Sequence, residues 1–196
     1  MSAWASPARW RPAGSAFIAG LLALAGSAGP ASALMPVEEY SVKAAYLVNF
    51  AGFVRWPATA FASARSPFVV CVAGEDPFGA AFGPFGGNKI DGHPLEVRLV
   101  ASSTAAPTGC QILFVASSEV RRLPEILREA QRDAVLTVSD IDDFAADGGM
   151  IQLFIRDRKV RFEINQKAAE AGGLKIDARL LKLAEPAGDA GGEVRR

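Results

Sequence analysis

The side chains that could take part in catalysis are few and widely separated in this 196-residue chain. The single histidine, His93, stands in an Asp-Gly-His-Pro turn, and no nucleophile lies at a spacing that would make it a general base. Asp140, Asp142 and Asp143 could hold a cation, but no calcium-loop pattern follows them, and helix capping accounts for these carboxylates. Phosphate-loop, nucleophile-elbow and zinc-helix motifs are absent from the sequence. We therefore expect a protein that is not an enzyme and that needs neither a metal nor a cofactor.

Polar residues that follow buried strands form a first candidate binding group. In an open α/β sheet, ligands bind in the crevice beyond the carboxyl ends of the strands. The predicted strands 68–73, 111–116 and 134–138 each run into polar residues. As candidate ligand or partner contacts we name Glu75, Asp76, Ser139 and Asp140, with Ser117 and Ser118 between them in the chain. A purely structural role stays open, because loops after strands are usually polar.

A predicted hairpin in residues 148–165, GGMIQLFIRDRKVRFEIN, carries a second candidate group. Its first strand, 150–155, is apolar on both faces except at Gln152, as in a covered sheet. In the second strand, 159–164, alternate residues are apolar, so Arg161, Glu163 and Asn165 must face the other way. We expect Arg161 and Glu163, with Arg179 nearby, to present a polar surface to a ligand or partner, and Asn165 to cap the next helix. Ion pairing on a solvated face is the structural alternative.

Two cysteines, Cys71 and Cys110, remain after the expected removal of an export signal. Export places them in an oxidising compartment, so a disulfide between them is the expected arrangement. Such a bond would close a loop of about 40 residues and contribute roughly 4 kcal/mol on the chain-entropy estimate. Metal binding is the weaker alternative, because it needs more ligands than these cysteines and one histidine supply.

The elements that must position these residues alternate between helix and strand. Apolar spacing predicts a core helix over residues 38–56, ended by Pro57, and a second helix over residues 119–132 with Val120 on its inner stripe, capped by Ser117 or Ser118. Pro124 indicates that the regular part of this helix starts late. Strands are expected at 68–73, 95–100, 111–116 and 134–138, with a loop at 83–92. Short helices are expected after the loop at Asp76, from Asp142, after Asn165 and after Asp177.

This order predicts an α/β fold, a single domain with a mostly parallel sheet, helices on both faces and a late antiparallel hairpin. The first 33 residues read as a secretory signal peptide, with Arg9 and Arg11 before an apolar run and a small-residue cleavage site near Ala33. We expect the exported domain to cover residues 34–184 and a disordered tail to cover 185–196. Removing the signal leaves 19 basic and 21 acidic residues, a net charge of −2, which does not favour nucleic acid as a partner.

Five motifs together resemble the YfiR family of exported bacterial proteins. They are K-A-A-Y-L-x-N-F-A-x-F-x-x-W-P at residues 43–57, G-E-D-P-F-G at 74–79, C-x-I-L-F from Cys110, L-T-V-S-D at 136–140, and G-G-M-I followed by K-V-R-F-E-I-N within residues 148–165. Each motif is weak alone, but the combination is specific and spans nearly the whole exported part of the chain.

The resemblance implies a periplasmic repressor of an inner-membrane diguanylate cyclase. Such a protein binds the periplasmic sensor domain of the cyclase and lowers cyclic-di-GMP output, and an outer-membrane, peptidoglycan-associated lipoprotein can sequester it. The family also implies homodimers, disulfide-dependent stability and no catalysis. Cys71 and Cys110 fit this pattern, whereas the second cysteine pair of some relatives is missing here. The alternative is a periplasmic small-molecule-binding module that acts on another membrane sensor, such as a kinase.

Overall fold

The computed structural model describes residues 36–100 and 109–186, all of which belong to one compact unit of the chain, Ala33–Arg196. The expected signal peptide, residues 1–33, and residues 187–196 of the expected tail, 185–196, lie outside the described residues. Within the described ranges, no helix is both long enough and apolar enough to span a membrane.

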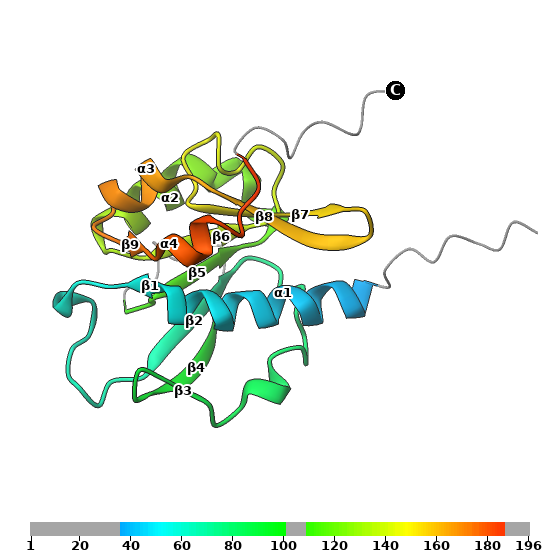
Figure 1. Ribbon diagram of the computed structural model, residues 1–196. Helices are drawn as coiled ribbons and strands as arrows, with labels where there is room; N and C mark the ends of the chain where they lie inside the picture. Colours follow the sequence, from blue (N-terminus) through cyan, green and yellow to red (C-terminus); the bar gives the residue numbers. More distant parts are fainter. Residues whose placement is uncertain (1–35, 101–108, 187–196) are drawn as a thin grey trace, which may run out of the picture. The chain divides into compact units, whose positions relative to one another are not determined.

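A seven-stranded sheet forms the centre of the described fold (Figure 1). In sheet order its strands are β3 (Lys89–Ile90), β4 (His93–Val100), β2 (Phe68–Ala73), β5 (Ile112–Val115), β6 (Leu136–Ser139), β7 (Ile151–Arg156) and β8 (Lys159–Ile164). Neighbouring strands from β4 to β7 are parallel, whereas β3–β4 and β7–β8 are antiparallel. The predicted mostly parallel sheet with a late hairpin is confirmed. The short edge strand β3 lies where the sequence predicted only a loop.

The hairpin between β7 and β8 turns in two residues. Asp157 and Arg158 have φ angles of 50° and 58°, in the left-handed region that a tight turn of this type requires. The turn places Arg156 opposite Lys159 and Ile151 opposite Ile164. The predicted antiparallel strand pair is therefore confirmed.

Helices cover both faces of the sheet (Figure 1). Because side chains alternate along a strand, Val70 of β2 faces α1 (Pro36–Phe50), whereas Cys71 faces α2 (Leu123–Arg132). Leu47 of α1 is fully buried in the first core, and Ile126 of α2 lies in the second. The shorter α3 (Gln166–Ala171) and α4 (Ala178–Leu181) contribute Ala169 and Leu180 to the α1 side. The prediction that helices cover both faces of the sheet is confirmed.

The first helix is shorter than the sequence pattern predicted. It ends at Phe50 and continues as a single 3-10 turn, η1 (Ala51–Phe53), before strand β1 (Val54–Arg55). Glycine at position 52 is a poor helix former, and Pro57 keeps the residue before it out of the helical region. β1 pairs with β9 (Lys175–Ile176) in a small second sheet, so a partner about 120 residues away decides the end of the helix.

The start of the second helix also differs from the prediction. Residues 117–122 form a 3-10 segment, η4 (Ser117–Arg122), and α2 begins only at Leu123, next to Pro124, so the late start is confirmed. Neither serine caps the segment. Val120 is 51% exposed rather than buried, because 3-10 winding changes the direction of its side chain from the α-helical spacing.

Turns replace two of the short helices that the sequence predicted. After Asp76 the chain forms turns and a 3-10 segment, η3 (Gly83–Phe85), and after Asp142 it forms turns. Another 3-10 segment, η2 (Ala58–Ala60), follows β1. The caps of the last two helices are confirmed: the Asn165 side chain accepts a hydrogen bond from the Ala168 amide, and that of Asp177 from the Arg179 amide.

The disulfide between Cys71 and Cys110 is present, as predicted. Its two Cα atoms lie 5.9 Å apart, and the cysteines are 39 residues apart in the chain. Both cysteines are buried on the α2 side. The bond links Cys71, in the middle of β2, to Cys110, which lies just before β5. It therefore closes the long connection that contains β3 and β4.

Candidate functional site

The carboxyl ends of three parallel strands meet at one edge of the sheet. Ala73 of β2 is opposite Val115 of β5, which in turn is opposite Ser139 of β6. The polar segments that follow these strands are therefore brought to the same edge, as the sequence indicated. Ser139 itself is fully buried: its hydroxyl donates to the Val115 carbonyl over 2.7 Å and accepts from the Ile141 amide over 3.0 Å. Its contacts are those of a structural residue.

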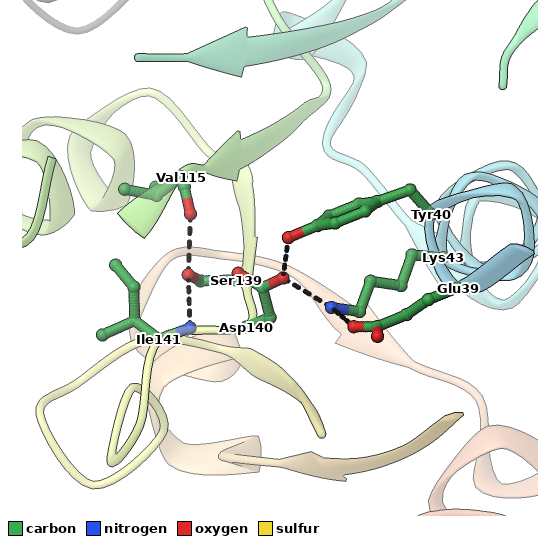
Figure 2. Close-up of polar contacts among 7 residues, drawn as sticks. All are labelled: Glu39, Tyr40, Lys43, Val115, Ser139, Asp140 and Ile141. Carbon is green, nitrogen blue, oxygen red and sulfur yellow. Dashed lines mark hydrogen bonds and ion pairs between the residues drawn. The ribbon is translucent and has the colours of Figure 1, made fainter. Parts of the chain in front are cut away.

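Asp140, the next residue, is the centre of a polar cluster with the first helix. Figure 2 shows Tyr40 and Lys43 reaching from α1 to the same oxygen of Asp140. The Lys43 ammonium lies 2.5 Å from Asp140 Oδ2 and 2.5 Å from Glu39 Oε1, and the Tyr40 hydroxyl donates to Asp140 Oδ2 over 2.8 Å. We call these four residues, Glu39, Tyr40, Lys43 and Asp140, the Asp140 cluster.

The Asp140 cluster is largely removed from solvent. The side chain of Lys43 is 3% exposed and that of Asp140 is 13% exposed. A buried ammonium requires a charged partner, and two carboxylates provide it here. Burial, followed by the hydrogen bond donated to Asp140, raises the pKa of Tyr40 far above its ordinary value. The phenol therefore stays protonated and remains a donor, and the cluster fastens the start of α1 to the end of β6.

The sequence analysis identified Asp140 but missed its partners on the helix. Lys43 lies four residues before Leu47 and seven before Phe50, and both of these are buried. That spacing places a lysine on the core side of the helix, where it needs an acidic partner. The position of Lys43 was thus readable from the sequence, whereas the identity of the partner, 97 residues away, was not.

The loop after β2 holds the two other predicted residues of this edge. Gly74 has a φ of +93°, and a Cβ atom there would lie 2.3 Å from Ser118 Oγ, so only glycine fits. The Glu75 amide donates to the same Ser118 oxygen over 2.9 Å. The Asp76 carboxylate accepts from the amides of Phe78 over 2.9 Å and Gly79 over 3.2 Å. These bonds give the loop a defined conformation at the carboxyl edge.

A pocket of about 620 Å³ opens beside this loop and the start of α1. Its size falls within the range of small-molecule sites. Most of its lining is apolar, and its polar residues are Tyr40, Ser41 and Asp76. The lining residues are Tyr40, Ser41, Asp76, Pro77, Phe78, Gly79, Ala80, Ala81, Pro84 and Phe85. Asp76 lines this pocket together with Tyr40, whose hydroxyl donates to Asp140. Two predicted residues of the carboxyl edge, Asp76 and Asp140, are thus connected through Tyr40.

The hairpin group is arranged differently from the prediction. The side chain of Arg161 is 44% exposed, but Glu163 is only 3% exposed, so the expectation that both face solvent is wrong for Glu163. Gln152 and Asn165 lie on the same face as Glu163, and both hydrogen bond to the backbone of Ala145. The turns around Ala145 therefore cover that face. Strand alternation gives the face of a residue but not what lies over it.

Arg179 does not join Arg161. Its guanidinium contacts Asp177 over 2.9 Å and lies over the ring of Phe53, 5.4 Å from the centroid. The side-chain hydrogen bond from Arg179 lowers the pKa of Asp177 to about 2, and the same bond raises the pKa of Arg179. This exposed pair belongs to the cap of α4.

Glu185, expected to start the tail, contacts the hairpin instead. Its carboxylate pairs with Arg156 and lies 3.6 Å from Arg161 Nε. Its amide donates to the Phe162 carbonyl over 2.9 Å, and it forms an isolated parallel bridge with Glu163. The chain is therefore held against the outer edge of β8 at this residue.

His93 and the acidic residues show no arrangement for metal binding in the described part of the chain. His93 Nδ1 lies 2.6 Å from the Ser66 carbonyl oxygen, and its ring stacks on Phe61 at 4.3 Å. Among the described residues, no three side chains of the types that bind metals come together.

The fold and these contacts define a disulfide-bonded α/β domain with ion pairs between Lys43 and Asp140, Arg156 and Glu185, and Asp177 and Arg179. The chain belongs to the YfiR/HmsC-like family, whose model matches residues 40–185. The match begins at Tyr40 of the Asp140 cluster and ends at Glu185, which pairs with Arg156 of the hairpin. It confirms the resemblance noted in the sequence. The family is one of regulatory, non-catalytic proteins. A comparison with curated proteins finds no match.

Proposed function

We propose that this protein is a periplasmic regulator that binds and represses the sensor domain of an inner-membrane diguanylate cyclase and so lowers cyclic-di-GMP. Membership of the YfiR/HmsC-like family over residues 40–185 is the observation that carries the proposal. The Cys71–Cys110 disulfide supports it, because disulfides persist in oxidising compartments. The proposal includes a signal peptide cleaved near Ala33, a domain over residues 34–184 and a disordered tail in the last residues of the chain.

Repression would follow from mass action. A regulator that binds the inactive conformation of a sensor more tightly than the active one shifts the equilibrium toward the inactive form. The shift cannot exceed the difference between the two binding free energies. An outer-membrane, peptidoglycan-associated lipoprotein that captures the regulator would lower its free concentration and release the cyclase. A homodimer would present the binding surface twice.

The tip of the β7–β8 hairpin, residues 155–161, is our candidate for the surface that contacts the sensor. It has four basic residues and one acidic residue, in a chain with a net charge of zero. Arg158 and Lys159 are exposed, and Arg161 has a 44% exposed side chain. Ile155 is 44% exposed on the opposite face of the hairpin, because it pairs with Val160 whereas Lys159 and Arg161 alternate to the other face. Exposed side chains of like charge suit an acidic partner surface.

Deletion of the gene tests the cyclase version directly. Cyclic-di-GMP, measured by mass spectrometry of cell extracts, should rise in the deletion strain and return to its original level when the cyclase gene is also deleted. The mass of the protein recovered from the periplasm should correspond to cleavage near Ala33. An unchanged cyclic-di-GMP level after deletion would contradict the proposal.

Charge reversal tests the hairpin surface in the same strain. Complementation with the Arg158→Glu/Arg161→Glu variant should leave cyclic-di-GMP near the deletion level, and its affinity for the purified sensor domain should fall about tenfold or more. The matched control is Arg121→Glu/Arg128→Glu, which reverses two exposed arginines on the η4–α2 segment. The control should restore repression. Equal behaviour of the two variants would exclude the hairpin as the contact surface.

A small-molecule-binding module that acts on another membrane sensor, such as a kinase, is the second candidate. The pocket of about 620 Å³ beside Tyr40 and Asp76 favours it. A ligand that binds only the folded state raises the unfolding temperature, so a thermal-shift screen separates this role from repression by protein contact alone. In this case deletion of the gene would change the output of the other sensor and leave cyclic-di-GMP unchanged.

A further inference from the structure

The pocket beside Tyr40 and Asp76 has a lining chemistry that is independent of the role in cyclase repression. Three aromatic residues, Tyr40, Phe78 and Phe85, contribute to its wall, and the Asp76 carboxylate is its one formally charged group. No lysine, arginine or histidine lines it. Aromatic faces and a carboxylate both attract cations, and the combination is typical of sites for organic ammonium groups.

Contacts among the lining residues, and with Phe114 and Asp140 outside the pocket, hold its walls in place. Phe78 is 5% exposed and meets the rings of Tyr40 and Phe114 edge to face, at centroid distances of 5.4 Å and 4.7 Å. Tyr40 is fixed by its hydrogen bond to Asp140, and Asp76 by the amides of Phe78 and Gly79. A carboxylate offers about four acceptor positions, so two remain for a ligand. Preorganised walls reduce the entropy lost on binding.

The neighbouring Asp140 cluster adds to the negative potential near the pocket. Lys43 lies over the Tyr40 ring, 4.4 Å from its centroid, but its charge is compensated by Glu39 and Asp140. The cluster together with Asp76 has three carboxylates and one ammonium group. A cation entering the pocket therefore meets a net negative charge, whereas an anion would be repelled.

Two other pockets among the described residues differ in this respect. One, of about 450 Å³, is lined by Arg128 and Lys167 as well as by Asp147. The other, of about 440 Å³, has Arg132 next to Asp133 in its lining. Both contain basic side chains, so neither has the charge that would select a cation.

We propose that the pocket formed by Tyr40, Asp76, Phe78 and Phe85 binds a small organic cation, an ammonium group attached to an apolar or aromatic body. The ammonium group pairs with Asp76 and lies against the aromatic rings, and the apolar body occupies the space beside Ala81 and Pro84. The site would let a periplasmic amine bind at the point where the start of α1 meets the sheet.

Three probes with one aromatic body and different charges test this selectivity. They are 2-phenylethylamine, which is cationic at neutral pH, 2-phenylethanol, which is neutral, and 3-phenylpropionate, which is anionic. Isothermal titration with the purified protein should show the amine binding at least about tenfold more tightly than the alcohol, with no detectable binding of the carboxylate. In amide NMR spectra, the amine should shift the signals of Phe78 and Gly79.

Two variants and a matched control complete the experiment. Asp76→Asn keeps an oxygen acceptor for the turn and should remove most of the preference for the amine over the alcohol, and Phe85→Ala should weaken both. Asp91→Asn makes the same charge change at an exposed turn outside the pocket and should bind the amine like the original protein. Equal affinity for the three probes, an unchanged preference in a folded Asp76→Asn variant, or no amine binding at millimolar concentration would each overturn the proposal.

Discussion

The parallel part of the sheet and its terminal hairpin are stabilised by different kinds of contact. In the parallel part, Cys71 of β2 is linked to Cys110 before β5, 39 residues away, and Lys43 of α1 is linked to Asp140 after β6, 97 residues away. The hairpin closes through a two-residue turn, and its charged side chains pair with Glu185 at the surface. The first region thus contains buried, long-range polar and covalent links, whereas the charged contacts of the hairpin lie at the surface.

This difference separates stability from recognition. Buried polar links are costly to break, because they leave a group without a partner in a medium that solvates it poorly. Exposed ion pairs contribute little to folding, because water and salt screen them. Substitutions in the parallel part should therefore lower the free energy of unfolding, whereas charged residues of the hairpin tip can be changed to test binding without unfolding the protein.

Removal of the disulfide should have the largest effect on the parallel part. The Cys71→Ala/Cys110→Ala variant frees a connection of 39 residues in the unfolded chain, which lowers the free energy of unfolding by about 4 kcal/mol on the chain-entropy estimate. Urea denaturation followed by circular dichroism measures it, and reduction of the original protein should give a similar loss. A loss below about 1 kcal/mol would show that this link is not what stabilises the parallel part.

Breaking the buried ion pair of the Asp140 cluster should have the second-largest effect on the free energy of unfolding. Lys43→Met leaves Asp140, 13% exposed, without its ammonium partner but still with the Tyr40 hydroxyl, so we expect a loss of about 3 kcal/mol, the lower end for a broken buried pair. Lys167→Met, at an exposed position of α3, is the matched control and should change stability by less than about 0.5 kcal/mol. Adding Asp140→Leu to Lys43→Met should recover part of the loss. If the two lysine variants were equally stable, the proposed contrast between buried and exposed links would fail.

A substitution of a charged residue in the hairpin should change the free energy of unfolding much less. Arg161→Ala removes a contact of 3.6 Å between a 44% exposed arginine and Glu185, so its effect on the free energy of unfolding should stay below about 1 kcal/mol. The same urea measurement serves here. A loss as large as that of Lys43→Met would mean that the hairpin charges are structural, and it would remove the basis for using them as a binding surface.

The contrast also explains what could be predicted from the sequence. The antiparallel hairpin, the caps at Asn165 and Asp177 and the parallel strands follow from local patterns, and the structure confirms them. The disulfide followed from the count of cysteines and the expected compartment. Features that depend on distant segments were missed or misplaced, because alternation and helical spacing describe only one segment at a time.

Two residues and the end of one helix illustrate that limit. Lys43 had a readable position on the buried side of α1, but nothing local indicated Asp140 as its partner. Glu163 was placed on the correct face of β8, but the turns around Ala145 that cover this face lie in another segment. The end of α1 depends on the pairing of β1 with β9 near the other end of the domain. In the candidate site, therefore, the acidic residues could be named from sequence and the aromatic pocket beside them could not.

The ion pair of Asp177 and Arg179 at the surface should make the smallest contribution to the free energy of unfolding. The pH dependence of that free energy measures this contribution. Hydrogen bonds from Arg179 lower the pKa of Asp177 from its ordinary value of 3.8 to about 2. A lowered carboxyl pKa stabilises the folded state above pH 3.8, and this contribution disappears as the pH falls toward 2. Asp177→Asn keeps an oxygen for the helix cap but loses the charge, so the urea midpoints of the two proteins should differ slightly above pH 4 and converge near pH 2. With Arg179→Met in the background, which removes the largest cause of the lowered pKa but keeps the backbone amide of residue 179, the pH dependence of this difference should shrink. A difference in midpoint that stays constant from pH 5 to about 2 would show that the ion pair does not lower the pKa of Asp177 in the folded state.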